Sequence, residues 1–467
     1  MQPMAQRTSG RKILRRLSTL TVTSLISAGI YVGAVLPATE PTPAFAEPCD
    51  PMGSSAVDIS VRLANGSTLS SMLAGSSDSS RQWYPGENYI GSSTPPFLPG
   101  QPTQLPVIAG HTQALSFLTG PGAPAMTNDR FDIAATDLGI SYADQWNNTV
   151  FLFGDTFACN WNINNWRSNT LVRTTDHNFD DGIGITEALT QRGFQGGGRA
   201  TQVIASKKVP GVEFTTIPTA GITVGGAQYI DFMSVRDWGD TGPWNTNFAA
   251  TARSFDGVNW EVMPNTYRTN LDTPVNALLG PIPHYRPGNE KLQQSAFMVA
   301  GDFVYRYTTG AGRATSAVVG RSPLNLFPDE NSFTYWDGRG WNPDPAAAVA
   351  VMDGEVSEFS VQWNGYLNKF ISLQYNNNGI VLRTAPNPEG PWDDRRMVID
   401  PGTLADAYGP FLLPNQTGPV IYWTLSTWSS YNVMEMRTDL RSLFAERPDS
   451  WNEDALRITD WIRYPGK

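Results

Sequence analysis

One short pattern returns five times along the chain, and it limits the possible folds more than any other feature. Each copy is a short strand-like run that ends in Arg followed by Ser or Thr, and a polar turn follows. The copies read TLVRTTD, ATARSFDG, AVVGRSPL, IVLRTAPN and VMEMRTDL, and their arginines are Arg173, Arg253, Arg321, Arg383 and Arg437. The arginines are 80, 68, 62 and 54 residues apart, which leaves room in each unit for a four-stranded sheet with long loops.

Recurrent small sheets indicate a β-propeller, in which radial packing hides the strand edges. Five returns predict five blades. A β-sandwich in which Arg-Ser/Thr pairs recur by chance is the alternative. Two copies, RSFDGVNW and RTAPNPEGPW, continue into a turn and then a Trp, which favours the propeller, with each Trp packed between neighbouring blades. A strand near residues 111–118 is expected to close the ring beside the last blade.

The composition agrees with an all-β domain. The chain has 467 residues, only 16% of them charged, and it contains 43 Gly, 35 Pro and 15 Trp. Short β-branched or aromatic runs bounded by Gly, Asn and Pro recur, and long amphipathic helical periods are scarce. Residues 47–110 are rich in Ser, Gly and Pro and are interpreted as an extended lead-in. Residues 111–467 would then be the propeller domain.

The first 46 residues have the three parts of a secretory signal. A basic region with Arg11, Lys12, Arg15 and Arg16 precedes an apolar stretch over residues 17–38, and Ala44-Phe45-Ala46 forms a small-x-small cleavage pattern. The predicted mature start is Glu47, and the mature protein is expected to be secreted to the cell envelope without a membrane span. An uncleaved anchor is the alternative, because the apolar run is nearly long enough to cross a bilayer.

Charge and cysteine content exclude several kinds of partner and cofactor. The net charge is −10, and removal of residues 1–46, with five basic residues and one acidic residue, would leave −14. A chain this acidic is a poor binder of nucleic acid or anionic lipid. Cys49 and Cys159 can form a disulfide after export or remain two separate thiols. With three scattered histidines they do not make a zinc site, so no metal or cofactor is predicted, although a structural cation in the channel stays open.

Several carboxylates interrupt apolar strands. Asp137 lies in AATDLGISY and Asp155 in VFLFGDTF, and their separation of 18 residues suits a hairpin that brings both to one end of the first blade. Glu358 in VSEFSVQW is a third candidate, and Asp231 in QYIDFMSV occupies a similar place in the second blade. Facing carboxylates are the machinery of glycoside hydrolysis, in which one donates a proton and the other activates water or attacks the sugar.

Aromatic and amide side chains follow these strands. Aromatic rings stack on sugar faces, and Arg and Asn hydrogen-bond hydroxyl groups. The predicted substrate-binding residues, in addition to Asp231, are Trp161, Trp166, Arg167, Asn169, Trp238, Trp244 and Asn247. Other interpretations remain open: Asp155 in Gly-Asp-Thr can simply cap a turn, and Trp-rich loops are often only packing. A glycan-binding propeller would use similar aromatic and polar contacts but would not require buried carboxylates.

The combined motifs resemble glycoside hydrolase family 183, formerly a family of domains of unknown function in actinobacteria. The motifs are DLGI, FLFGDTF and WRSNTLVRTTD within residues 137–176, FMSVRDWGDTGPWNTNF at 232–248, EFSVQWNGYLNKFISLQYN at 358–376 and GIVLRTAPNPEGPW at 379–392. The likeness covers roughly residues 125 to 440. The long lead-in over residues 47–125 and the presence of Asp231 depart from the family pattern.

The resemblance implies an endo-acting D-arabinanase with a five-bladed propeller. Its substrate would be the α-linked D-arabinofuranose chains of arabinogalactan and lipoarabinomannan in the envelopes of mycolate-bearing actinobacteria. Asp137 and Asp155 fall where the essential acidic pair of the family is expected. The alternatives are another furanosidase, such as an α-L-arabinanase or a fructan hydrolase, and a propeller that binds glycan without cleaving it. The expected partner is the polysaccharide alone, and a monomer is the simplest assembly.

Overall fold

The structure is a computed structural model, and it describes residues 105–108, 110–158, 166–238, 244–274, 276–376, 379–393 and 395–445. The predicted signal segment, most of the lead-in, Trp161 and both cysteines lie outside these residues. Within the described ranges, none of the helices is long and apolar enough to cross a membrane.

The described residues form five antiparallel sheets, the number that the sequence repeat indicated. The first sheet comprises β2 (Leu138–Ala143), β3 (Thr149–Phe153), β4 (Thr170–Thr174), β5 (Glu187–Thr190) and β6 (Gly193–Gln195). The second comprises β7 (Thr215–Val224), β8 (Ala227–Trp238), β9 (Trp244–Ser254), β10 (Glu261–Val262) and β11 (Arg268–Thr269). The third comprises β12 (Gln294–Ala300), β13 (Phe303–Thr309), β14 (Val318–Pro323), β15 (Thr334–Trp336) and β16 (Trp341–Asn342).

The fourth sheet comprises β17 (Ser357–Asn364), β18 (Lys369–Asn376), β19 (Gly379–Ala385) and β20 (Arg396–Ile399). The fifth comprises β1 (Thr112–Phe117), β21 (Ala407–Leu412), β22 (Val420–Thr427) and β23 (Asn432–Asp439). The helices are short: α2 (Thr127–Phe131), α3 (Leu440–Leu443) and the 3₁₀ turns η1 (Pro264–Thr266), η2 (Ala277–Leu279), η3 (Asn289–Lys291), η4 (Glu330–Ser332) and η5 (Pro345–Ala347). The predicted all-β fold is confirmed.

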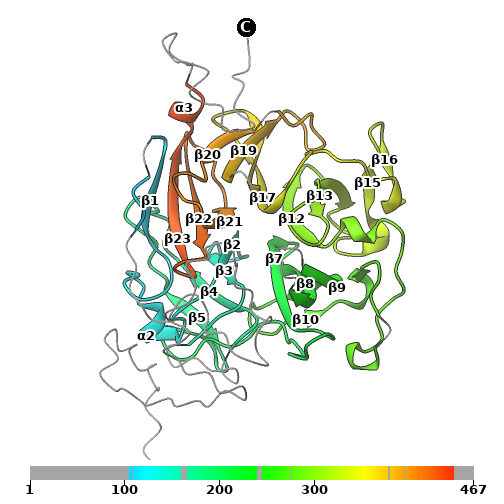
Figure 1. The fold of residues 1–467 in the computed structure, drawn as a ribbon, viewed down its shortest axis with the longest axis horizontal. Coiled ribbons are helices and arrows are strands. Elements are labelled where there is room, and N and C mark those ends of the chain that lie inside the picture. Colours follow the sequence, from blue (N-terminus) through cyan, green and yellow to red (C-terminus); the bar gives the residue numbers. More distant parts are fainter. Residues whose placement is uncertain are drawn as a thin grey trace, which may run out of the picture. The chain divides into compact units, whose positions relative to one another are not determined.

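The first strands of the five sheets contact one another in a closed ring. β2 contacts β7, β7 contacts β12, β12 contacts β17, β17 contacts β21, and β21 returns to β2. In Figure 1 these five strands lie nearest the centre of the ring that the sheets form. β1 pairs with β23 as the outermost strand of the last sheet, so that chain segments from the two ends of the domain share one sheet. The arrangement is that of a β-propeller, and the strand predicted near residues 111–118 closes the ring as expected.

The five repeated arginines occupy the third strand of each sheet, namely β4, β9, β14, β19 and β23. Arg173 lies 3.7 Å from the ring centre of Phe194 and forms an ion pair with Glu187. Arg321 lies 4.1 Å from the ring of Trp341, and Arg383 is paired with Asp353. The repeat therefore marks a structural position, in which a long side chain covers the outer strands of its own sheet or reaches a connecting loop.

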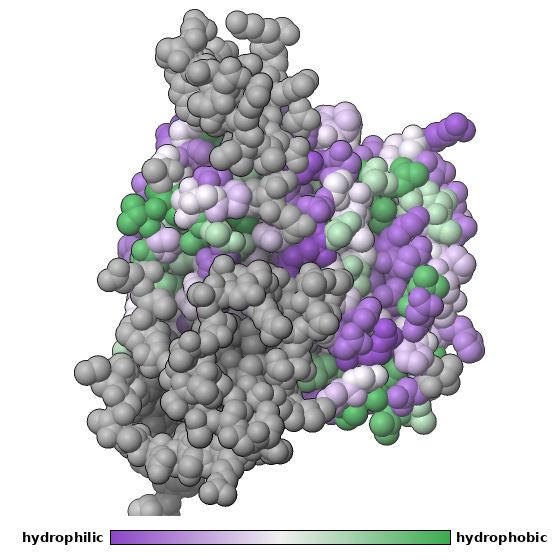
Figure 2. All heavy atoms as spheres, in the orientation of Figure 1, coloured by the Kyte–Doolittle hydropathy of each residue, from purple (hydrophilic) through white to green (hydrophobic). Residues whose placement is uncertain are grey.

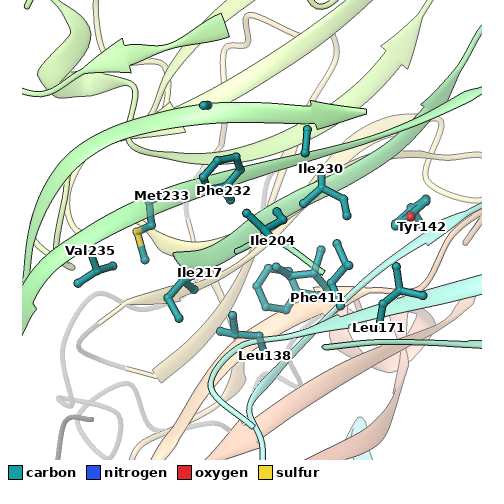
Figure 3. Packing of buried hydrophobic residues seen from close by; sticks show 14 of the residues in the cluster. Leu138, Tyr142, Leu171, Ile204, Ile217, Ile230, Phe232, Met233, Val235 and Phe411 are labelled. Carbon is teal, nitrogen blue, oxygen red and sulfur yellow. The ribbon is translucent and has the colours of Figure 1, made fainter. Parts of the chain in front are cut away.

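The core joins neighbouring sheets. Its largest cluster contains Leu138 and Tyr142 of the first sheet, Ile217 and Ile230 of the second, and Phe411 of the fifth. Figure 3 shows these side chains pointing toward one another from strands of different sheets. Polar and apolar residues are interspersed on the surface that Figure 2 shows, so the continuous apolar packing lies inside. The contacts that close the ring are thus contacts between residues far apart in sequence.

Four of the five innermost strands carry a β-bulge. The register shifts between Leu138 and Ile140 in β2, Pro218 and Ala220 in β7, Ser357 and Phe359 in β17, and Tyr408 and Phe411 in β21. A bulge bends a strand and redirects the side chain beside it, and bulges are frequent next to active sites. In this propeller they occur near the starts of the strands, where the candidate site is found.

Candidate active site

A pocket lies at the end of the ring where the innermost strands begin. It encloses about 610 Å³ of space not filled by protein atoms, part of it open to solvent. All five sheets contribute to its lining, which includes Asp137, Asp155, Met233, Trp238, Trp244, Gln294, Ser295, Arg313, Glu358, Tyr408, Trp428 and Tyr431. The pocket thus brings together the three predicted catalytic carboxylates.

Asp137 and Asp155 reach this end through the β2–β3 hairpin. Asp137 directly precedes β2 and Asp155 follows β3, and the pair Leu138 and Phe153 sets the register between them. The amide of Gly154 donates to the carbonyl of Asp137 over 3.2 Å. A Cβ at Gly154 would lie 2.4 Å from Oδ1 of Asp137. Glycine therefore allows the backbone before Asp155 to approach the other carboxylate closely.

Asp155 is buried and its carboxyl group is held in place. Its Oδ1 accepts hydrogen bonds from Trp166 Nε1 over 2.9 Å and from the Thr215 hydroxyl over 2.8 Å. Burial and the nearby charge of Asp137 raise the pKa of Asp155 well above its ordinary value. The two hydrogen bonds and the charge of Lys208 act in the opposite direction. The raised pKa favours a protonated carboxyl group, which is the form a general acid requires.

Asp137 is also buried, but one of its oxygens has no partner. Its Oδ2 accepts a hydrogen bond from the Tyr408 hydroxyl over 3.0 Å, whereas Oδ1 has no hydrogen-bond partner among the described residues. Burial raises the pKa of Asp137 to about 7, against the lowering effect of the Tyr408 and Tyr431 hydroxyls; the charge of Glu358 raises it further. A buried carboxylate oxygen without a partner is rare in folded proteins and calls for a functional explanation.

Glu358 lies at the bulge of β17 with a φ of +30°. A non-glycine residue rarely adopts this conformation, which costs roughly 1–3 kcal/mol and clusters at functional sites. Both carboxylate oxygens bond Arg313, through Nη2 and, over 3.2 Å, through Nε. The bidentate pair fixes the carboxylate at the pocket wall. The third candidate is thus neutralised by a cation, unlike Asp137 and Asp155.

Arg313 is itself surrounded by aromatic rings. Its guanidinium carbon lies 4.9 Å from the ring centre of Trp244 and 5.7 Å from those of Tyr408 and Trp428. Gln294 donates to the carbonyls of Gly310 and Gly312, which precede Arg313 in the chain, over 3.1 and 2.8 Å. Tyr408 stacks on Trp428 with ring centres 4.2 Å apart and an interplanar angle of 14°. The pocket wall therefore contains several aromatic rings gathered around one guanidinium group.

Of the predicted substrate-binding residues, Trp238 and Trp244 line the pocket. Their ring centres are 5.6 Å apart in an edge-to-face arrangement. Trp244 is buried, and its Nε1 has no hydrogen-bond partner among the described residues. An indole N–H of this kind beside a pocket is available as a donor to a ligand hydroxyl group.

Three predicted binding residues that follow β3 stand behind Asp155 and do not line the pocket. Trp166 donates to Asp155 and stacks on Phe214, with ring centres 5.1 Å apart. Arg167 donates to the carbonyls of Ala200 and Asp132. Asn169 donates to the carbonyls of Ile204 and Thr216 and accepts from the amides of Val203 and Ile204. Their side chains support the loops around Asp155, because backbone groups of those loops need buried partners.

Asp231 and Asn247 likewise lie outside the pocket lining. Asp231 is fully buried in β8, with hydrogen bonds from Arg268 and Ser295 over 2.8 Å each, and another from Thr251. Asn247 donates to the carbonyl of Val212 over 2.7 Å. The sequence analysis gave Asp231 a similar place in the second blade because it also interrupts an apolar strand, but Asp231 lies within the second strand of its sheet and faces Arg268. Its contacts are structural.

The sequence did not single out Arg313, Tyr408, Trp428 or Tyr431. Tyr408 lies at the start of the innermost strand β21. Arg313 lies in the loop between β13 and β14, and Trp428 and Tyr431 lie in the loop between β22 and β23. Tyr408 occupies in β21 the place near the strand start that Glu358 occupies in β17. Comparing the position of Glu358 across the repeats would have found Tyr408, but nothing in the strand of Tyr408 alone points to it.

No metal site is apparent at the pocket or elsewhere in the described ranges, where no group of three or more His, Cys, Asp or Glu side chains is arranged to hold an ion.

Fold and site together define a β-propeller with a carboxylate-bearing, aromatic-walled pocket at one end of the ring. The chain belongs to the family described as domain of unknown function (DUF4185), whose model matches residues 122–437. It is similar to the notoamide biosynthesis cluster protein J of Aspergillus sp. (strain MF297-2), with 28% identity over 337 residues that span 66% of this chain and 84% of the relative.

Two solved structures share a distant likeness. One is the catalytic domain of a family 62 α-L-arabinofuranosidase from Coprinopsis cinerea, at 11% identity, with a TM-score of 0.40 and coverage of 72% of this chain and 99% of that one. The other is a family 117 glycoside hydrolase from Zobellia galactanivorans, at 12% identity, with a TM-score of 0.41 and coverage of 77% of this chain and 100% of that one.

Proposed function

We propose that this protein is a glycoside hydrolase that uses Asp137 and Asp155 as its acidic pair. The observation that carries the proposal is the environment of Asp137. Its carboxylate is buried, Oδ1 has no hydrogen-bond partner among the described residues, and its pKa is raised to about 7. The charge of Asp137 in turn raises the pKa of the second buried carboxyl group, Asp155. A turn cap would have its oxygens bonded to backbone amides, whereas Asp155 Oδ1 accepts from the side chains of Trp166 and Thr215.

The two carboxyl groups would have different roles. Asp155, whose pKa is raised well above its ordinary value, would donate its proton to the glycosidic oxygen as the bond to the anomeric carbon breaks. Asp137 would act in its ionised form, either removing a proton from the attacking water or attacking the anomeric carbon directly. If Asp137 is the base, it takes a proton from water, the remaining hydroxide bonds the anomeric carbon, and proton exchange with solvent restores both groups. If Asp137 is the nucleophile, water cleaves the resulting glycosyl ester, supplying the new hydroxyl group and returning a proton to Asp155.

The aromatic wall would hold the sugar. The indole N–H of Trp244 is available to a sugar hydroxyl group, and Trp238 and Trp244 provide apolar ring surface in the pocket. Arg313 keeps Glu358 paired, so that the pocket contains one neutralised carboxylate beside the two whose pKa values are raised. These contacts suit a neutral sugar with several hydroxyl groups.

We further propose that the substrate is an α-linked D-arabinofuranose polymer cut internally, as in arabinogalactan and lipoarabinomannan. The support is the resemblance of four separate motifs to glycoside hydrolase family 183. Three of these motifs contain pocket residues, namely Asp137 with Asp155, Trp238 with Trp244, and Glu358. The signal-like segment over residues 1–46 supports action outside the cell, on the envelope.

The test is incubation of the secreted protein with purified D-arabinan, followed by chromatography of the released oligosaccharides. Internal cleavage is expected to give a series of short oligosaccharides, and the Asp155→Asn protein should release none above background. Parallel incubations with α-L-arabinan and fructan separate the other furanosidase activities. Binding of D-arabinan without any release of oligosaccharides would instead identify a glycan-binding propeller.

A further inference from the structure

A second hollow lies at the opposite end of the strands from the carboxylates. Its lining comes from the first and fifth sheets and includes Asn147, His177, Phe179, Asn415, Thr417 and Tyr422. Asp137 precedes β2 and Asn147 lies in the turn that follows it, so β2 separates the two places by its six residues, or roughly 20 Å. The hollow is therefore distinct from the candidate active site.

The turn that forms one wall of the hollow is rigid. The Asp144 carboxylate accepts hydrogen bonds from the amide of Trp146 over 2.9 Å and from the amide of Asn148 over 2.8 Å. It also accepts from the Asn148 side chain over 2.8 Å. Asn147 sits at the tip in the left-handed region, with a φ of 65°. The Asn147 side chain is exposed at a fixed place rather than carried on a loose loop.

The polar groups of the hollow are uncharged amides, hydroxyls and an imidazole. Asn147 Nδ2 lies 3.5 Å from His177 Nε2. Asn415 is exposed with a φ of 62°, and within the described part of the chain its side chain has no hydrogen-bond partner. Phe179 and Tyr422 add two rings whose centres are 5.8 Å apart. No Asp, Glu, Lys or Arg belongs to the lining. Such a surface suits a neutral ligand with hydroxyl groups and apolar ring faces.

The side chains on this turn are not needed for the connection itself. The equivalent turn between β7 and β8 is Gly225-Gly226, and that between β12 and β13 is Gly301-Asp302. Each of these turns joins the first and second strands of its sheet without an aromatic or amide side chain. The β2–β3 turn is longer and carries Trp146, of which 55% is exposed and which lines a neighbouring hollow on the other side of the turn. The first blade therefore presents ring and amide groups that the second and third lack.

We propose that this hollow is a second, non-catalytic binding site for a neutral glycan chain, and that it holds the polymer whose cleavage is proposed above. The inference rests on that proposed function for the identity of the glycan. The chemistry of the lining favours a sugar over an anion, because the hollow offers no cationic side chain and the protein carries a net charge of −10. Binding here would keep the enzyme on a long polymer between cleavage events.

The experiment measures retention of the full chain on immobilised D-arabinan, in an Asp155→Asn background that prevents digestion of the polymer. Asn147→Gly with Asn415→Gly removes both amides, and glycine tolerates the left-handed backbone at both positions. The double variant is expected to bind about tenfold more weakly, as the loss of one or two hydrogen bonds to a ligand would cause. His177→Ala, at an exposed position, provides a second variant should the double variant prove unstable.

Asn368→Gly is the matched control. Asn368 is also an exposed asparagine in the left-handed region, with a φ of 50°, but it lies in the turn after β17 outside the hollow, and its replacement should leave retention unchanged. Equal retention of all variants would show that Asn147 and Asn415 only shape turns, and would overturn this inference alone. Retention that depends on them without hydrolysis by the wild-type protein would overturn the proposed function alone. Neither retention nor hydrolysis would overturn both.

Discussion

Two groups of buried carboxylates in this propeller have opposite surroundings. In the second and third sheets, Asp231 and Glu330 are paired with cations: Arg268 lies 2.8 Å from Asp231, and Arg306 lies 2.7 Å from Glu330. At the pocket, neither Asp137 nor Asp155 forms a salt bridge with any described residue. All four side chains lie mostly out of water, so burial alone does not separate the two groups.

The difference appears in the direction of the pKa shifts. Burial tends to raise the pKa of Glu330, but Arg306 and Arg268 outweigh it, and the pKa is lowered. At the pocket, burial prevails, and the pKa values of Asp137 and Asp155 are raised. A fold gains nothing from a buried carboxylate without a cation, since removing the charge from water is costly. The carboxylates without a cation, Asp137 and Asp155, are therefore the candidates for proton transfer. The carboxylates paired with arginine, Asp231 and Glu330, are the candidates for stabilising the fold.

The largest expected effect is on catalysis. Asp155→Asn keeps the shape and two hydrogen bonds of the side chain but removes the transferable proton. Turnover of D-arabinan should fall by about 10³-fold or more, because the group acts mainly in the transition state. The melting temperature should change little, and both quantities are measured on the same preparation. An active but less stable variant would mean that Asp155 is a structural cap.

The second prediction concerns the paired group. Arg268→Met leaves Asp231 buried without its cation, and unfolding by urea should show a loss of about 3–5 kcal/mol. The folded fraction should cleave substrate at close to the wild-type rate, since Arg268 does not line the pocket. Full stability would refute the view that this network supports the fold.

The third prediction is a pH dependence of stability. The folded state keeps a proton on Asp137 up to about pH 7, whereas the unfolded state releases it near 3.8. The folded state therefore binds more protons between these values, and stability should fall as pH rises through this window, by a few kcal/mol at most. Asp155 and Glu435, whose pKa values burial also raises, contribute in the same direction, so the measurement is the difference between wild type and Asp137→Asn. The variant should lose less stability between pH 4 and pH 7, and an identical pH profile would contradict the raised pKa.

The smallest expected effect comes from Gly154→Ala. The added Cβ would meet Oδ1 of Asp137 at 2.4 Å, so the carboxylate must move within the pocket. A displacement of this kind should reduce turnover roughly 10–100-fold, as misplaced catalytic groups do. Gly338→Ala is a poor comparison because its φ is +91°, whereas Gly340→Ala meets nothing within 4 Å and serves as the control. Unchanged turnover in Gly154→Ala would argue against a catalytic role for Asp137.

Much of the fold could be predicted because it rests on local periodicity. The five Arg-Ser/Thr copies lie on five equivalent third strands, and the strand near residues 111–118 completes the last sheet. The Asp137 and Asp155 pair was also predictable, because a short hairpin fixes both residues relative to one another through its own register.

The rest of the pocket could not be found in this way. Asp231 and Asp155 look alike in sequence, since each interrupts an apolar strand, yet one faces Arg268 and the other faces Asp137. Asn169 and Arg167 were reasonable candidates for sugar contacts, but their side chains instead bond backbone groups, among them the carbonyls of Ala200 and Ile204.

The sequence by itself thus determined the class of fold, the five repeated units and the hairpin that joins two carboxylates, although three of the described sheets have five strands rather than the expected four. Only the tertiary structure decided which carboxylates are neutralised, which aromatic rings form the wall, and that Arg313 pairs with Glu358 across 45 residues of chain. The physical reason is that a strand's pattern depends on neighbours one or two residues away, whereas the charge state of a buried group depends on whatever the closed ring places beside it.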